Sequence, residues 1–254
     1  MDGLCRQIAT RKSELDRLRA RSPRALGNLE HVHDLELTYT SNAIEGNTLS
    51  AAETMLVIEQ GITIGGKPLK DHLEAIDHHE AIAYVRDLAR QGTPLTEADI
   101  RTLHGLVVKR SVPDIAGRYA DQGRYVLTDA GRRSFPSLAE VPPLMADFVA
   151  WLRAAPGTPA TAFAAHRRLV DIHPFNDGNG RTARLLMNLL LIRDGYPPVA
   201  VRPQDRPSYI NALQQAQTRQ GEAAFNRLLC ERLAATLSEY IAALQAAASS
   251  PDEG

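Results

Sequence analysis

Residues 173–184 of the chain read HPFNDGNGRTAR and continue directly into the apolar run LLMNLLLI at 185–192. The stretch predicts a helix that ends before Pro174, a short polar loop, and a second helix that is apolar enough to be buried. The first turn of a helix presents free backbone N–H groups and the positive end of its dipole. We therefore expect an anion-binding site where the second helix begins.

The side chains of this stretch suit a polyphosphate. Gly178 and Gly180 let a bulky anion approach the backbone. Arg181 and Arg184 are three residues apart, so both can reach one side of the helix entrance, and guanidinium groups match phosphate oxygens. Asp177 offers a carboxylate for Mg²⁺ (or Mn²⁺), which binds through one or two carboxylates together with substrate phosphates.

A candidate general base lies four residues before Asp177. His173 titrates near neutral pH and is placed to take a proton from an incoming nucleophile. Each of these features alone is more often structural, since Asp-Gly and Asn-Gly pairs usually mark turns and a lone histidine usually packs. Their concentration at one helix entrance favours a functional site. The motifs GxxxxGK(S/T), GxGxxG after a strand, and the calcium loop are absent from the sequence.

The whole-chain composition excludes several classes of protein. The 254 residues are 44% hydrophobic and 5% aromatic, which predicts one large aliphatic core, and the net charge of −1 gives no bulk attraction to nucleic acid or anionic membrane. Cys5 and Cys230 lack the spacing of a disulfide framework or zinc site. No signal peptide or membrane helix is predicted. We expect a soluble, cytoplasmic protein without nucleic-acid or membrane partners.

Periodicity and capping signals predict an all-α fold with one β-hairpin. Capping boxes are expected at Ser50 and Thr96. The hairpin is expected at 123–135, with its turn at 129–131. The expected helices cover 2–20, 27–44, 51–60, 69–90, 97–110, 140–152, 160–171, 182–194, 206–219 and 222–246. The organisation expected is an N-terminal helical region (1–60), a catalytic domain (61–248) and a disordered tail (249–254).

The segment 173–184 resembles the Fic family motif HxFx(D/E)GNGRxxR at every defined position. The resemblance extends over about 42–241 and is nearest to metazoan Fic adenylyltransferases and their bacterial relatives. It includes AIEGNT at 43–48, FVAWL at 148–152, LLMNL at 185–189 and GYPP at 195–198. It implies a Fic-type helical bundle with a hairpin flap that transfers AMP from ATP to a Ser, Thr or Tyr hydroxyl of a target protein.

The resemblance also implies roles for individual residues. His173 is the general base, Asp177 holds the metal against the α- and β-phosphates, and Phe175 anchors the loop. The hairpin would pair with the target polypeptide through Tyr125, Val126 and Leu127, although a hairpin that merely covers the core is an alternative. The nucleotide contacts implied are the backbone of Gly178, Asn179 and Gly180, the side chains of Arg181 and Arg184, and, around the base, Tyr209 and Gln217.

A second pattern lies near the N-terminus. SNAIEG at 41–46 resembles the family's inhibitory pattern (S/T)xxxE(G/N). By this resemblance, Glu45 would pair with Arg184 and keep ATP from binding productively, and Ser41 would hydrogen-bond Glu45 and orient it. A surface glutamate beside a turn is the structural alternative.

Other functions remain open at this stage. A Fic fold can perform another phosphoryl or nucleotidyl transfer, or remove AMP when the inhibitory glutamate activates water. A non-enzymatic helical regulatory module is a further reading, disfavoured by the intact motif. Relatives often form homodimers, so a homodimer is one expected assembly.

Overall fold

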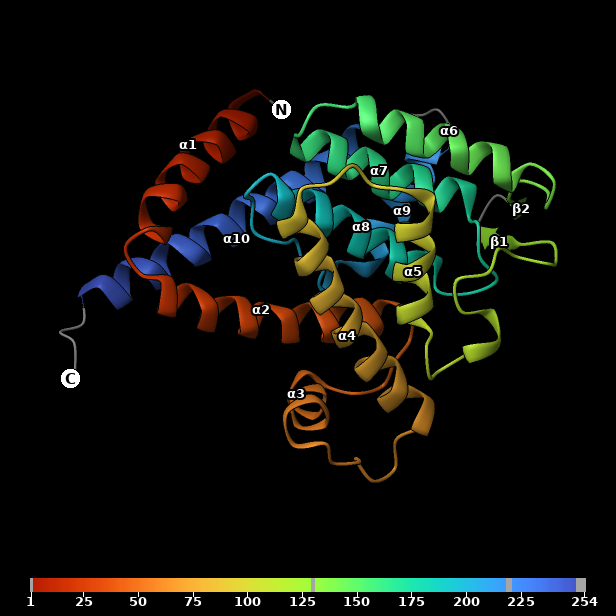
Figure 1. The fold of residues 1–254 in the computed structure, drawn as a ribbon, viewed down its shortest axis with the longest axis horizontal. Coiled ribbons are helices and arrows are strands. Elements are labelled where there is room, and N and C mark those ends of the chain that lie inside the picture. The colour runs from red at the N-terminus through yellow and green to blue at the C-terminus, as the bar shows by residue number, and fades with distance from the viewer. Residues whose placement is uncertain (1, 129–130, 218–220, 250–254) are drawn as a thin grey trace.

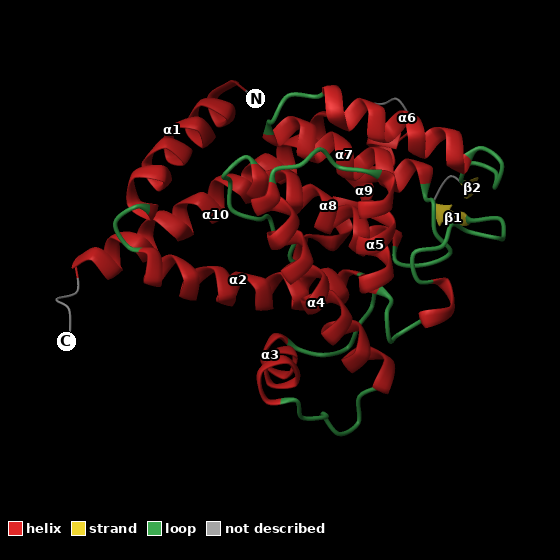
Figure 2. Ribbon diagram, in the orientation of Figure 1, coloured by secondary structure: helices red, strands yellow, loops and turns green. Residues whose placement is uncertain are grey.

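The computed structural model describes residues 2–128, 131–217 and 221–249 and shows the expected all-α fold with one hairpin (Figures 1 and 2). Two short 3₁₀ turns lie at Pro113–Ile115 and Pro203–Asp205. The helices are α1 (Asp2–Arg19), α2 (Pro23–Ile44), α3 (Ala51–Gln60), α4 (Leu69–Gln91), α5 (Glu97–Val107), α6 (Val141–Ala154), α7 (Pro159–Ile172), α8 (Asn179–Arg193), α9 (Arg206–Gln217) and α10 (Ala223–Ser249).

Helix α8 lies at the centre of the fold. It packs against α7, α4 and α5 and touches α2, while α1 lies along α10 at one end of the molecule (Figure 1). Most α8 side chains from Asn179 to Leu191 are buried, as the apolar run predicted. The core around it is mainly aliphatic, in keeping with the low aromatic content. The functional segment is therefore held by the most enclosed helix of the chain.

Local sequence signals explain where three of the helices begin. Both capping boxes are present: Ser50 with Glu53 begins α3, and Thr96 with Asp99 begins α5. Helix α2 begins at Pro23 rather than near residue 27, because Pro23 occupies the first helical turn, where a missing N–H costs nothing. Helix α5 ends at Val107, before the expected residue 110.

The hairpin consists of β1 (Tyr125–Thr128) and β2 (Gly131–Ser134), paired antiparallel with Tyr125 opposite Ser134. The remainder of its expected turn, 129–130, lies outside the described residues, as does the expected tail apart from Ser249, which ends α10. None of the described helices combines the length and apolarity needed to cross a membrane.

Candidate active site

The loop between α7 and α8 is fixed by its own side chains. Asn179 closes a ring with the main chain of Phe175: its Oδ1 accepts from the Phe175 N–H (3.0 Å) and its Nδ2 donates to the Phe175 carbonyl (2.8 Å). The Phe175 ring is fully buried and stacks on His104 at 3.7 Å. The side chain of Asn179 thus shapes the loop, and only its backbone N–H remains for a ligand.

Helix α8 begins three residues earlier than expected because Gly178 caps it in the left-handed conformation (φ 77°). A Cβ at Gly178 would approach Val108 to 3.0 Å, so a side chain is disfavoured by both backbone and space. Among the described residues, the backbone N–H groups of 179–181 have no hydrogen-bond acceptor. The helix entrance therefore carries free donors, as the sequence predicted.

A carboxylate lies against this entrance. The predicted ion pair between Glu45 and Arg184 is present, with Oε1 of Glu45 2.7 Å from a guanidinium nitrogen. A Cβ on Gly180 would overlap that same oxygen. The Glu45 side chain thus occupies space at the positive end of α8. Burial by itself lowers the pKa of Arg184, but the Glu45 carboxylate and Tyr209 together outweigh burial, so the pKa lies above the ordinary arginine value.

The predicted contact of Ser41 is wrong. The Ser41 hydroxyl accepts from Nε of Arg184 (3.0 Å) and the Ser41 carbonyl accepts from Nη2 (2.9 Å), so Ser41 holds the arginine instead of Glu45. The reason is that Arg184 is buried and needs acceptors, and the last turn of α2 supplies a hydroxyl and an unpaired carbonyl.

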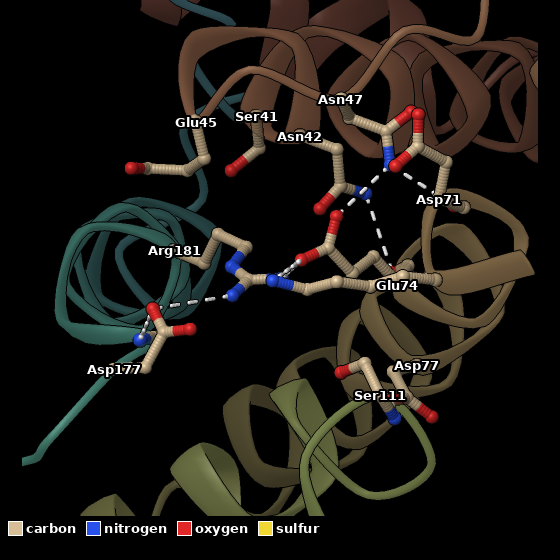
Figure 3. A network of polar contacts seen from close by, with 12 residues as sticks. Ser41, Asn42, Glu45, Asn47, Asp71, Glu74, Asp77, Ser111, Asp177 and Arg181 are labelled. Carbon is tan, nitrogen blue, oxygen red and sulfur yellow. Dashed lines mark hydrogen bonds and ion pairs between the residues drawn. The ribbon is translucent and has the colours of Figure 1, made fainter. Parts of the chain in front are cut away.

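Arg181 has different partners, although it lies on the same helix. Its Nη1 is 3.1 Å from Oε1 of Glu74, and its Nη2 is 3.6 Å from Oδ1 of Asp177 (Figure 3). The approach to Glu74 is an ion pair without hydrogen-bond alignment, so Nε and Nη1 have no hydrogen-bond acceptor within the described parts of the chain. The Arg181 side chain is only 3% exposed, which makes these vacant donors costly without a ligand.

His173 is held in the form that a base requires. It ends α7 with φ 50°, the one described non-glycine residue with positive φ, and such strain is common at functional sites. Its Nδ1 lies 3.3 Å from the Val170 carbonyl, so Nδ1 carries the proton and Nε2 keeps its lone pair. The ring stacks on Phe135 at 3.8 Å. Burial lowers the pKa of His173 to about 4, so the imidazole is neutral at pH 7.

The Asp177 carboxylate suits a metal ion whose other ligands are phosphate oxygens and water molecules. Its side chain is 51% exposed, and Oδ1 accepts from the Gly178 N–H. No group of three or more acidic, cysteine or histidine side chains suited to a metal occurs among the described residues. A single exposed carboxylate beside an anion site matches Mg²⁺, which retains waters and shares phosphate oxygens.

A cavity of about 270 Å³ brings together part of this set of residues. Glu45, His173, Gly180 and Arg184 line it, together with Phe135, Val170, Ile210, Leu213, Gln214 and four predicted site residues: Tyr125, Val126, Tyr209 and Gln217. The volume lies just below the range of small-molecule sites, and Glu45 takes up part of it. Six other predicted site residues are not among the lining residues: Ser41, Leu127, Asp177, Gly178, Asn179 and Arg181. Leu127 is 74% exposed.

Several contacts around the cavity escaped the sequence analysis. The Arg124 Nε donates to the His173 carbonyl (2.9 Å), and Arg133 of β2 reaches Gln217 on α9. The Tyr209 hydroxyl bonds Nε2 of His166 (2.8 Å), so this tyrosine is anchored below the cavity. The arginines of the hairpin were visible in the sequence, but nothing there indicated their partners. Glu74 was missed although it lies on a helix whose buried face is unusually polar.

The profile of the Fic/DOC family matches residues 94–191. A protein adenylyltransferase Fic from Nematostella vectensis is 39% identical over 70% of this chain and 42% of its own length. The structure of a Fic-domain-containing signalling protein from Bacteroides thetaiotaomicron is 33% identical, with a TM-score of 0.89 and coverage of 98% of this chain and 100% of that one.

A structure of Fic-1 from Caenorhabditis elegans is 28% identical, with a TM-score of 0.82 and coverage of 96% of this chain and 72% of that one. The chain spans 41–44% of the length of the first curated relatives it matches, so the likeness covers one part of those proteins.

Proposed function

Because this chain belongs to the Fic/DOC family, we propose that it is a protein adenylyltransferase that moves AMP from ATP to a Ser, Thr or Tyr hydroxyl of a target protein. The observation that carries the proposal is the shared cavity in which His173 lies together with Gly180 and Arg184. A proton acceptor and an anion site are thereby presented to the same bound molecule.

The reaction requires one proton transfer and no covalent enzyme intermediate. The target oxygen bonds to the α-phosphorus of ATP, the bond from that phosphorus to the oxygen bridging to the β-phosphorus breaks, and pyrophosphate leaves. The hydroxyl proton passes to Nε2 of His173, which is free because Nδ1 faces the Val170 carbonyl. A pKa of about 4 keeps the imidazole neutral and ready to accept that proton at pH 7.

Charge stabilisation comes from the entrance of α8. The free N–H groups of 179–181 and the helix dipole face the phosphates, and Arg184 receives the terminal ones. Arg181 lies behind this entrance with two donors lacking acceptors, which supports a role in phosphate binding. Asp177 would hold Mg²⁺, which neutralises charge on the phosphates when it is bound.

The hairpin and α9 define the rest of the site. Tyr125 and Val126 line the cavity beside His173, so a polypeptide that pairs with β1 brings its hydroxyl to the base. Tyr209 and Gln217 of α9 line the same cavity, which supports contact between α9 and the nucleotide base. Leu127, being 74% exposed, serves target docking outside the cavity.

Glu45 acts as a brake in this proposal. Its carboxylate pairs with Arg184 and lies beside Gly180, and a γ-phosphate needs the same guanidinium. Two anions cannot share this place without repulsion, so ATP binds productively only when Glu45 moves away.

Radiolabelling tests the proposal. Wild type, Glu45→Gly and Glu45→Gly/His173→Ala are incubated with lysate and either [α-³²P]ATP or [γ-³²P]ATP. We expect protein label from the α-labelled nucleotide alone, much stronger with Glu45→Gly and lost with His173→Ala. Label from [γ-³²P]ATP would indicate phosphorylation instead. Equally strong labelling by wild type and Glu45→Gly would contradict inhibition by Glu45.

A further inference from the structure

We propose that Glu74 is a positioning residue of this site: it neutralises Arg181 and thereby leaves the Asp177 carboxylate free for the metal. The inference rests on the proposed function, because it assigns Asp177 to a metal-bound nucleotide. Glu74 lies on α4, about 100 residues away from both partners in the sequence, and outside the cavity.

The Glu74 carboxylate has three partners. Oε1 faces Nη1 of Arg181 at 3.1 Å and Nζ of the exposed Lys70 at 3.5 Å, and Oε2 accepts from Nδ2 of Asn47 at 3.1 Å. The Glu74 backbone carbonyl accepts from Nδ2 of Asn42 at 3.3 Å. The Glu74 side chain is 9% exposed, so it has little freedom to turn away (Figure 3). The segment that carries Glu45 therefore holds Glu74 in place, and Glu74 faces Arg181.

Arg181 lies between two carboxylates of unequal burial. Glu74 is nearer and enclosed, whereas Asp177 is farther, at 3.6 Å, and half exposed. A buried guanidinium needs a compensating charge, and leaving one uncompensated is strongly destabilising. With Glu74 ionised, that need is met without Asp177. If Glu74 were neutral, the electrostatic drive would pull Asp177 inward onto Arg181 and away from a metal.

A purely structural role for Glu74 makes a different prediction. If Glu74 only braced the segment 42–48, its removal would lower stability but leave the balance between Arg181 and Asp177 unchanged. Glu74→Gln keeps the size of the side chain and removes the charge. Removing the Arg181 charge as well should then abolish the effect, because no buried cation remains to compete for Asp177.

The experiment measures ATP binding by calorimetry, with Mn²⁺ and with EDTA, on the full chain carrying Glu45→Gly. The variants are Glu74→Gln, Arg181→Gln, and both together. Glu80→Gln is the matched control, because Glu80 lies on the same helix and pairs with Lys109 and Arg110 away from the site. We expect Glu74→Gln to weaken Mn²⁺·ATP binding by about tenfold or more, to change metal-free ATP binding little, and to add nothing to Arg181→Gln.

Two results would overturn the inference. One is Mn²⁺·ATP binding by Glu74→Gln equal to that of Glu80→Gln. The other is additive losses in the double variant, which would show that Glu74 does not act through Arg181. If the Glu45→Gly parent itself neither bound Mn²⁺·ATP nor transferred label from [α-³²P]ATP, the proposed function would fail and the inference with it. A parent that binds and labels normally confines failure to the role of Glu74.

Discussion

Replacing Glu45 with glutamine should make the free protein less stable than wild type, but more stable than wild type when ATP is added. The change removes the 2.7 Å ion pair with Arg184 and leaves that arginine bonded to Ser41. The Glu45 side chain is 39% exposed, so solvent screening reduces the loss to about 1 kcal/mol. For a chain of this size the melting temperature should fall by about 2–4 °C.

With Mg²⁺·ATP, Glu45→Gln should have a higher melting temperature than wild type. Without the competing carboxylate, the nucleotide gains Arg184 and the α8 entrance; tenfold tighter binding adds about 1.4 kcal/mol at saturation. Thermal denaturation with and without Mg²⁺·ATP measures both effects. Glu59→Gln is the control, because Glu59 is 40% exposed and pairs with His31 at 2.9 Å, remote from the cavity. Equal ATP-induced shifts in wild type and Glu45→Gln would refute competition between Glu45 and phosphate.

Two further predictions concern the folded scaffold. Asn179→Ala should lower the free energy of unfolding by about 2–4 kcal/mol in urea titrations, because it leaves the buried N–H and C=O of Phe175 without hydrogen-bond partners. A loss below about 0.5 kcal/mol would contradict this. Burial lowers the pKa of His104 and His173 to about 4 and of His166 to about 3, below the ordinary 6.5. Between pH 6.5 and 4 the unfolded chain therefore binds more protons than the folded chain. As the pH is lowered through this range, the free energy of unfolding should fall by about 1.4 kcal/mol per pH unit for each of these histidines. A urea midpoint that stays constant from pH 6.5 to 5 would contradict this.

The fold was largely predictable because its signals are local. The capping boxes at Ser50 and Thr96 place helix starts through hydrogen bonds within one turn, and both are present. The start of α8 was missed by three residues because Gly178 adopts a left-handed cap, and a glycine in a polar loop gives no sign of which conformation it takes. Helix starts set by side chains were therefore predicted better than this one, which depends on backbone conformation.

The long-range contacts of the site were predictable only where family resemblance supplied them. Spacing suggested that Arg181 and Arg184 act together, but three residues turn the helix enough to direct them to different neighbours: Arg184 meets α2 and Arg181 meets α4. The sequence nevertheless held a signal for Glu74. Helix α4 buries Asp71, Glu74 and Asp77 alongside its apolar residues. Carboxylates on a helix face that is otherwise apolar are rarely buried unless they are paired, and the candidate partners are arginines. Arg110 forms an ion pair with Asp77, and Arg181 forms one with Glu74. A carboxylate at a core position of a helix thus predicts a polar partner elsewhere in the chain. For Asp71 that partner is Thr48. For Glu74 it is the buried Arg181, which belongs to the motif itself.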